Sequence, residues 1–269
     1  MIGYLGPRNS FTYFAATTFY VKNELVPYSN LHRLFEALEN DEVIGIVVPI
    51  ENSIEGSIHE VLDKLLHPEF HITREIVMEI ELSLISKNND LSQIKHVISN
   101  VYALAESRKI LKNTLGSYKE ILASSTSSAI NQLNDLDDTY AAIASKKAIY
   151  GDLNILINNI TDTDQNTTRF VFITKTLEVV GFHNKVSIVC APKGNVAGAL
   201  YDILHEFAIR KIDLSKIESR TKKSTLGEYI FYLDFYGNIE DEDVKNALEI
   251  LHYKTSYLKI IGSYYSKKK

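Results

Sequence analysis

Four clusters of hydroxyl, amide and basic side chains lie beside short apolar runs of the sequence. Three of them precede a helix-like stretch, and the fourth opens an apolar run. The clusters are Gly6-Pro7-Arg8-Asn9-Ser10-Phe11-Thr12, Pro49-Ile50-Glu51-Asn52-Ser53-Ile54-Glu55-Gly56-Ser57, Ser124-Ser125-Thr126-Ser127-Ser128 and Asn166-Thr167-Thr168-Arg169-Phe170. Side chains of these types either cap helices or hold a small anion.

Both interpretations stand, and the number of polar residues does not choose between them. Ser, Thr and Asn before a helix satisfy its free backbone N–H groups, and for any one cluster taken alone capping is the favoured interpretation. In open α/β sheets, however, ligands lie at the carboxyl ends of strands, where helix N-termini direct N–H groups at them. Several hydroxyl-rich turns with one arginine would then hold a small carboxylate.

The sequence lacks the motifs of several other chemistries. It has no GxGxxG or GxxxxGK[ST] phosphate loop, no HExxH and no GxSxG. Its eight histidines are scattered, and none pairs with a carboxylate at metal-ligand spacing. Cys190, the one cysteine, lies in an apolar run and is expected to be a small core residue. We therefore expect neither a metal nor an organic cofactor.

Length and charge restrict the class of protein. The 269 residues are 45% hydrophobic and 23% charged, which suits one or two globular domains. No run of eighteen apolar residues and no signal-peptide pattern is present, so a cytoplasmic protein without a membrane partner is expected. The net charge of −5 provides no general basic field for a nucleic-acid partner.

The charge is also uneven along the chain. Residues 183–269 hold 14 Lys or Arg and 11 Asp or Glu, a net of +3, whereas residues 1–182 hold 15 and 23, a net of −8. An anion bound by the first part must therefore be recognised by local groups against an unfavourable overall field.

Apolar periodicity predicts the elements that position the clusters. Strands are expected at residues 1–5, 44–49, 71–85, 95–98, 140–143 and 168–174. Helices are expected at residues 11–20, 31–38, 58–66, 102–115 and 127–133. This alternation predicts a largely parallel sheet covered by helices. The long extended stretch 71–86 breaks the alternation and is expected to pass from one sheet to another, which would give two α/β lobes with a cleft between them.

The C-terminal part has a different pattern. Strands are expected at residues 185–191, 214–219, 228–235 and 257–263, with helices at 196–209 and 243–251. The resulting order βαββαβ is typical of a ferredoxin-like domain.

Taken together, the clusters resemble the motifs of the prephenate dehydratase family over nearly the whole chain. The matching segments are Gly6-Pro7 with Ser10-Phe11-Thr12 (GPxG[ST]F), Val48-Pro49-Ile50-Glu51-Asn52-Ser53 with Gly56 (VPIENSxxG), Ala141-Ala142-Ile143-Ala144 (AAIA) and Asn166 with Thr168-Arg169-Phe170 (NxTRF). In the tail, Gly198-Ala199-Leu200 and Glu218-Ser219-Arg220 resemble the GAL and ESR motifs of the family's regulatory ACT domain.

Several positions depart from the family pattern. Asn9 replaces a glycine, and Asn tolerates the left-handed conformation better than most residues do. The segment Ser99-Asn100-Val101-Tyr102-Ala103-Leu104 stands in place of SHPQAL. In the tail, Lys193-Gly194-Asn195-Val196-Ala197 replaces PDxPG, and Thr221 replaces the proline after ESR.

The resemblance implies an α/β fold of two domains. Residues 1–180 would form a two-lobed catalytic domain like that of periplasmic binding proteins, and residues 184–269 a ferredoxin-like ACT domain. That ACT domain would pair with its copy in a homodimer or homotetramer. Phenylalanine would be the allosteric effector. The expected effector-binding residues are Gly198, Ala199, Leu200, Glu218, Ser219 and Arg220.

The resemblance also implies a lyase that converts prephenate to phenylpyruvate, water and carbon dioxide in phenylalanine biosynthesis, without a cofactor. Thr168 would be the catalytic residue and would hydrogen-bond the departing hydroxyl. Arg169 would pair with a substrate carboxylate, or else form a structural salt bridge with Glu51. The other substrate-binding residues would be Ser10, Thr12, Asn52, Ser53, Gly56 and Thr126.

Two alternative functions remain. The first is an arogenate dehydratase, because nothing in the sequence separates an amine from a keto group on the substrate side chain. The second is a catalytically silent phenylalanine sensor, which would keep both domains but is disfavoured by the intact Thr168-Arg169-Phe170.

Overall fold

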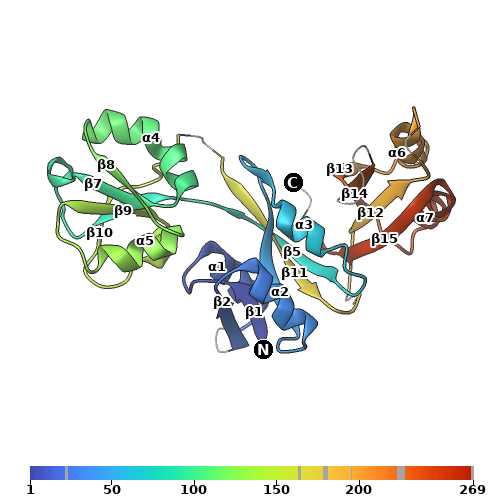
Figure 1. The fold of residues 1–269 in the computed structure, drawn as a ribbon, viewed down its shortest axis with the longest axis horizontal. Coiled ribbons are helices and arrows are strands. Elements are labelled where there is room, and N and C mark those ends of the chain that lie inside the picture. The colour runs from blue at the N-terminus through green and yellow to red at the C-terminus, as the bar shows by residue number, and fades with distance from the viewer. Residues whose placement is uncertain (22–23, 163–164, 178–180, 195, 223–227, 268–269) are drawn as a thin grey trace. The chain divides into compact units, whose positions relative to one another are not determined.

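The protein has a mixed α/β fold, as expected (Figure 1). The computed structural model describes residues 1–21, 24–162, 165–177, 181–194, 196–222 and 228–267. The chain forms two compact units. Unit 1 consists of Met1–Leu34, Glu51–Gly56 and Val77–Phe170, and unit 2 of Phe35–Ile50, Ser57–Ile76 and Val171–Lys269. Among the helices in the described ranges, none combines the length and apolar character needed to cross a bilayer.

Unit 1 contains a five-stranded sheet of order β10-β6-β9-β7-β8. Its strands are β10 (Asn154–Ile157), β6 (Ser83–Ser86), β9 (Tyr140–Ala144), β7 (His96–Ser99) and β8 (Lys119–Leu122). Strands β9, β7 and β8 run parallel, whereas β6 is antiparallel to both of its neighbours.

Two helices cover opposite faces of this sheet. Alternate residues of β9 divide between them: Ala141 and Ile143 pack with α4 (Val101–Leu115), and Ala142 packs with α5 (Thr126–Leu133). Such a division follows from the two-residue period of a strand. Both helices flank the sheet in Figure 1.

The N-terminal strands of unit 1 form a parallel pair at one end of the ten-stranded sheet. Strand β1 (Ile2–Leu5) lies beside β2 (Leu25–Tyr28), and α1 (Phe11–Phe19) connects them. The ring of Tyr4 in the strand packs against the ring of Tyr13 in the helix in a tilted arrangement, with centroids 5.5 Å apart. This packing fixes the start of α1, where the first polar cluster lies.

In unit 2, the tail forms a four-stranded antiparallel sheet with the expected order βαββαβ. Its elements are β12 (Lys185–Pro192), α6 (Ala199–Ile209), β13 (Leu214–Thr221), β14 (Tyr229–Tyr236), α7 (Glu242–Lys254) and β15 (Thr255–Tyr264). Helices α6 and α7 lie on one face of this sheet (Figure 1), where Cys190 is a buried core residue, as predicted.

The tail sheet continues into three further strands, each of which has only part of its length in unit 2. Its order is β13-β14-β12-β15, followed by β5, β11 and β3. These added strands are β5 (His71–Glu79), β11 (Thr167–Thr174) and β3 (Gly45–Asn52). At the junction Gly262 lies opposite Ile72, and a Cβ at Gly262 would lie 2.6 Å from the Ile72 carbonyl oxygen. Glycine therefore allows this close approach.

The remaining elements are short or connect these strands. They are α2 (Leu31–Glu39), β4 (Gly56–Ser57), α3 (His59–Lys64) and the 3-10 turns at Leu91–Gln93 and Lys146–Ala148. The extended stretch 71–86 does pass between two sheets, because β5 belongs to one and β6 to the other. Strand β3 continues through Asn52, three residues beyond the expected end, and brings part of the second cluster into the sheet.

Candidate active site

The second and fourth polar clusters meet where β3 ends and β11 begins. Asn52 Nδ2 donates hydrogen bonds to Asn166 Oδ1 at 2.7 Å and to Thr168 Oγ1 at 2.9 Å. Asn52 Oδ1 accepts from the backbone N–H groups of Ile54 and Glu55 at 2.8 and 3.0 Å. Because a backbone N–H only donates, these two bonds fix the orientation of the Asn52 amide.

The hydrogen bond from Asn52 also determines the role of the Thr168 hydroxyl as an acceptor toward the amide. Its oxygen accepts from Asn52, and Thr168 is itself buried, with 8% exposed surface. A hydroxyl carries one proton besides its acceptor lone pairs. The arrangement therefore leaves the proton of Thr168 for another oxygen.

Ser53 and Gly56 shape the backbone of the same segment. The Ser53 N–H donates to the Thr167 carbonyl at 2.9 Å, and Ser53 Oγ accepts from the Thr167 N–H at 3.0 Å. Ser53 thus ties this turn to β11. Gly56 has φ +79°, a left-handed conformation that glycine adopts without a steric penalty.

The side chain of Arg169 faces the other side of the sheet from that of Thr168. Its side chain is 7% exposed and places Nη1 3.6 Å from Glu51 Oε2. Successive residues of a strand face opposite sides of the sheet, so Asn52 and Thr168 share one face while Glu51 and Arg169 share the other. This geometry supports the structural salt bridge, the second of the two roles expected for Arg169.

The first and third clusters also meet. Ser127 Oγ donates to the Asn9 carbonyl at 3.2 Å, and Asn9 has φ +66°, in agreement with the tolerance expected for Asn there. Ser10 caps α1 by accepting from the Tyr13 N–H at 3.2 Å, and Ser125 caps α5 in the same way. The capping interpretation thus holds for both clusters, and each also supplies a helix N-terminus suited to anions.

Thr12 and Thr126 lie in the first turns of these helices. Thr12 is the second residue of α1 and is 6% exposed, whereas Thr126 is the first residue of α5. Every residue predicted to bind substrate lies in unit 1.

Sequence reasoning missed Glu106 of α4. Asn166 Nδ2 donates to Glu106 Oε2 at 2.8 Å. Burial raises the pKa of the Glu106 carboxyl; the hydrogen bond from Asn166 opposes this change, and the negative charge of Glu55 adds to it. The changed segment 99–104 lies at the start of the same helix, where Asn100 is the N-cap. No local sequence pattern marks Glu106, because its contact depends on where α4 lies over the sheet.

A cavity of about 380 Å³ opens beside the first cluster. Its lining consists of Phe11, Val77, Met78, Glu79, Glu81, Ser145, Lys146 and Lys147. Lys146 pairs with Glu81 at 2.9 Å, and Lys147 Nζ lies 5.9 Å from the centre of the Phe14 ring. Glu79 and Glu81 balance the charges of the two lysines, so the lining carries no net charge.

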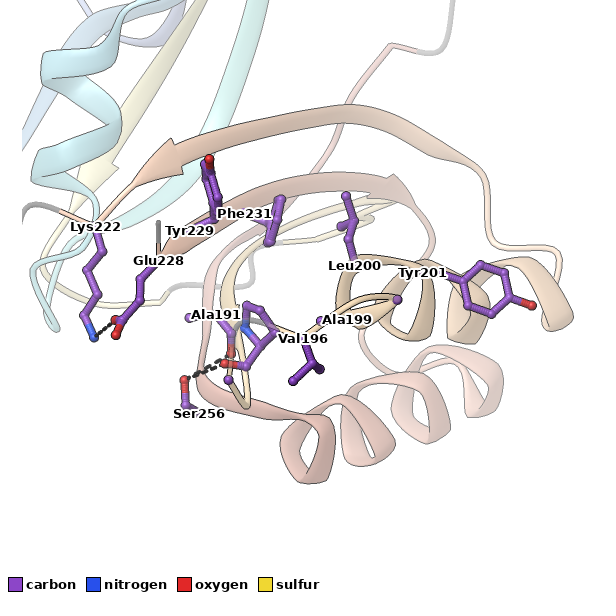
Figure 2. A pocket seen from close by; sticks show the side chains of 13 residues that line it. Ala191, Val196, Ala199, Leu200, Tyr201, Lys222, Glu228, Tyr229, Phe231 and Ser256 are labelled. Carbon is purple, nitrogen blue, oxygen red and sulfur yellow. Dashed lines mark hydrogen bonds and ion pairs between the residues drawn. The ribbon is translucent and has the colours of Figure 1, made fainter. Parts of the chain in front are cut away.

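A second cavity, of about 550 Å³, lies in the tail (Figure 2). Gly198 (φ +89°), Ala199 and Leu200, the residues of the GAL resemblance, are part of its lining. Figure 2 shows Lys222 and Glu228 paired at one side, with Nζ and Oε2 3.1 Å apart. Leu200 and Phe231 supply apolar surface.

The other expected effector residues are not brought to this cavity. Glu218 Oε2 accepts from Ser57 Oγ at 3.1 Å, and Glu218 Oε1 lies 3.3 Å from His59 Nε2. Arg220 Nη2 lies 3.3 Å from Asp63 Oδ1 of α3. Ser219 lies between them on β13, and strand alternation turns it toward the opposite face.

The fold and the polar site define a class of protein: an α/β chain with a hydroxyl–amide site and a ferredoxin-like C-terminal part. A family model described as prephenate dehydratase matches residues 2–177. The prephenate dehydratase of Methanocaldococcus jannaschii is 40% identical over 246 residues, which cover 89% of this chain and 87% of the relative. The chain therefore belongs to the prephenate dehydratase family.

Two further relatives extend this comparison. The arogenate dehydratase/prephenate dehydratase 2 of Arabidopsis thaliana is 35% identical over 279 residues, covering 98% of this chain and 72% of its own length. The crystal structure of prephenate dehydratase from Arthrobacter aurescens, in complex with L-Phe, matches with a TM-score of 0.88 at 31% identity. That match covers 98% of this chain and 90% of the Arthrobacter chain.

Proposed function

We propose that this chain catalyses the decarboxylating dehydration of prephenate to phenylpyruvate. The observation that carries the proposal is the contact between Asn52 and Thr168, which directs the Thr168 proton away from the amide. Family membership supports the substrate, and the first and third clusters supply two helix N-termini for its carboxylates.

The reaction needs orientation more than activation. The bond from the ring to its carboxylate breaks to release carbon dioxide, and its electron pair enters the ring. The C4–oxygen bond breaks as the ring becomes aromatic, and the hydroxyl leaves as water with one proton that is taken up from solvent. The Thr168 hydroxyl donates a hydrogen bond to that departing oxygen, and a positioned donor of this kind is effective because it needs no reorganisation.

Turnover of prephenate by the purified protein, followed by the absorbance of phenylpyruvate, tests this proposal. Thr168→Ala should lose most turnover while keeping the wild-type thermal midpoint. Thr167→Ala is the matched control, because the Thr167 side chain faces the other side of β11. Wild-type turnover in Thr168→Ala would remove Thr168 from the mechanism.

Arogenate is a second candidate substrate, favoured by the relative named arogenate dehydratase/prephenate dehydratase 2. The same assay with arogenate distinguishes the two, since arogenate yields phenylalanine directly. The substrate with the higher kcat/KM is the preferred one.

We further propose that the tail is a phenylalanine-binding ACT domain over residues 184–269, and that residues 1–180 carry catalysis. The βαββαβ order and the cavity beside Gly198 support this assignment. The Lys222–Glu228 pair offers opposite charges to the carboxylate and ammonium of an amino acid, and Leu200 and Phe231 offer apolar contact to its ring. We expect the enzyme to act in the cytoplasm as a homodimer or homotetramer.

Calorimetric titration with phenylalanine, paired with the turnover assay, tests the regulatory proposal. Binding with inhibition is expected. Binding by a chain that turns over neither substrate would instead indicate a silent sensor, and the absence of both binding and inhibition would contradict a phenylalanine site.

A further inference from the structure

A chain of hydrogen bonds runs from Thr168 to a carboxylate on another element. Asn52 Nδ2 donates to both Thr168 Oγ1 and Asn166 Oδ1, and Asn166 Nδ2 donates to Glu106 Oε2 at 2.8 Å. Thr168 and Asn166 belong to the segment around the start of β11, whereas Glu106 belongs to α4. The chain thus connects the reacting hydroxyl to a helix.

The direction of every bond in this chain is determined. The backbone N–H groups of Ile54 and Glu55 hold Asn52 Oδ1, so its amide nitrogen must face Asn166 and Thr168. The atom of Asn166 that faces Asn52 must then be an oxygen. The amide nitrogen of Asn166 consequently faces Glu106, which has to accept.

We propose that Glu106 is a positioning residue for Thr168. This inference rests on the proposed function, in which Thr168 donates to the departing hydroxyl. The acceptor at Glu106 keeps Asn166 from rotating, since a rotated Asn166 would present its nitrogen to the nitrogen of Asn52. Glu106 therefore acts through Asn166 and Asn52 and touches no reacting atom.

The surroundings of Glu106 agree with a positioning role. The carboxyl is half-buried, burial disfavours its charged form, and the charge that acts on it from Glu55 is also negative. Placing a carboxylate in such surroundings costs stability. The positioning role explains why a carboxylate is nevertheless present here, because it accepts the hydrogen bond that orients Asn166.

Two substitutions of Glu106 distinguish the effect of its hydrogen-bond acceptor from the effect of its negative charge. One introduces an apolar residue, and the other introduces a neutral residue that still accepts. Glu106→Leu should lower kcat about tenfold and leave KM within about twofold, because this factor corresponds to about 1.4 kcal/mol, the size of one hydrogen bond that is used in the transition state. Glu106→Gln should keep near-wild-type kcat, since its amide oxygen still accepts. Glu120→Gln, which alters the exposed partner of Arg108, is the control and should change nothing.

A double-mutant cycle with Thr168 makes the test specific. In the Thr168→Ala background, Glu106→Leu should cause no further loss of the residual turnover, because the residue through which it acts is gone. If Glu106→Leu does not fold, the pair Glu106→Gln with Asn166→Asp offers a second test: Asn52 still donates to an oxygen at position 166, and the last bond is reversed, with the new amide at 106 donating to the new carboxylate. The kcat of this pair should exceed that of Asn166→Asp alone.

Three results would overturn this inference: an unchanged kcat in Glu106→Leu, an equal loss in Glu106→Gln, or a further tenfold loss in the double mutant. A wild-type protein that turns over neither prephenate nor arogenate overturns the proposed function together with this inference. If the wild-type protein is active and Glu106→Leu has the same kcat, only this inference is overturned and the proposed function stands.

Discussion

The side-chain amide of Asn52 makes several of the hydrogen bonds that determine the geometry of the site. Asn52→Asp keeps an oxygen for the N–H groups of Ile54 and Glu55 but removes the donor to Thr168. We expect kcat to fall about a hundredfold, the usual effect of losing one preorganised donor. Steady-state kinetics with prephenate measure this. Asn88→Asp, an amide in an exposed turn, should be neutral; equal losses in both variants would contradict a specific role for Asn52.

Asn9 offers a test of backbone strain at the same scale. Its φ of +66° requires a residue that tolerates the left-handed region. Asn9→Ala should lower the free energy of unfolding by about 1 kcal/mol, whereas Asn9→Gly should change it by less than about 0.5 kcal/mol. Urea denaturation of the two variants provides the comparison. Equal stability of both would show that the turn relaxes.

The sequence predicts Asn52 and Thr168 as residues of this site but does not predict Glu106, which is hydrogen-bonded to them through Asn166. The sequence predicts that Asn52 and Thr168 belong to one site, and the structure adds the hydrogen bond between them. Strand alternation, applied to the same segments, already separates Arg169 from Thr168. Glu106 escapes prediction because its contact depends on where α4 lies over the sheet, and no local pattern encodes that placement.

At the scale of elements, the strands that escaped prediction are short and marginal. Strands β10 and β8 are the two ends of the five-stranded sheet, and β2 is likewise an end strand. Each has only four residues, β8 contains Lys119 and Glu120, and β2 contains Pro27. Edge strands face solvent on one side and tolerate charge and proline, so they carry weak periodicity. The central strands, which are buried on both faces, were predicted because their apolar runs are continuous.

Strand β13 carries a link between the tail and the segment that follows the Asn52 turn. Glu218 contacts Ser57 and His59, and Lys216 Nζ donates to Ser57 Oγ at 2.6 Å. If Glu218 couples the two parts, Glu218→Ala should bind phenylalanine within about twofold of the wild-type affinity. Half-inhibition of turnover should then require about tenfold more phenylalanine, a coupling change of ordinary size.

Calorimetric titration and inhibition curves measured on the same preparation of Glu218→Ala decide between coupling and binding. Glu249→Ala, an exposed glutamate of α7, is the matched control. Loss of phenylalanine binding in Glu218→Ala would assign this residue to the effector site, as the ESR resemblance suggests.

Glu206 joins α6 to α7 and makes the tail sensitive to acid. It accepts from Arg210 at 2.7 Å and also contacts Lys254, with its own side chain 6% exposed. The hydrogen bond from Lys254 lowers the pKa of the Glu206 carboxyl, and Arg210 adds to this effect against burial. A lowered pKa stabilises the folded chain above the ordinary carboxyl pKa, and this stability is lost as the pH falls through the folded-state value.

Glu206→Gln should therefore cost about 2 kcal/mol of unfolding free energy at pH 7, with the difference from wild type shrinking below about pH 4. Denaturation curves across this pH range measure the difference. Glu249→Gln should show no such dependence. A constant difference at all pH values would contradict the ion-pair explanation.

At the scale of the whole molecule, the uneven charge has a structural counterpart in unit 2. The positive tail places lysines and Arg220 on the sheet face opposite α6 and α7, where they meet acidic and carbonyl groups of the preceding chain. Lys185 pairs with Glu75 at 3.1 Å, and both side chains are less than a tenth exposed. Lys259 donates to the carbonyls of three residues at and beyond the end of α3, namely Leu65, His67 and Phe70.

These contacts bear on the predicted division at residues 180–184. Tyr232 of the tail donates to the Leu62 carbonyl at 2.9 Å, and Lys259 satisfies carbonyls that a helix end leaves free. A chain that ends at residue 182 loses both donors, and Glu75 loses its buried partner. The first part of the chain thus depends on the tail for part of its hydrogen bonding.

We therefore expect residues 1–182, expressed alone, to unfold at least about 10 °C below the full chain, since several unpaired buried polar groups cost a few kcal/mol. Thermal unfolding followed by circular dichroism measures this, with Lys259→Met in the full chain as an intermediate case that removes only one of the donors. A fragment as stable and active as the full chain would show that residues 1–182 are independent of the tail. Regulation would then have to act through contacts other than those around α3.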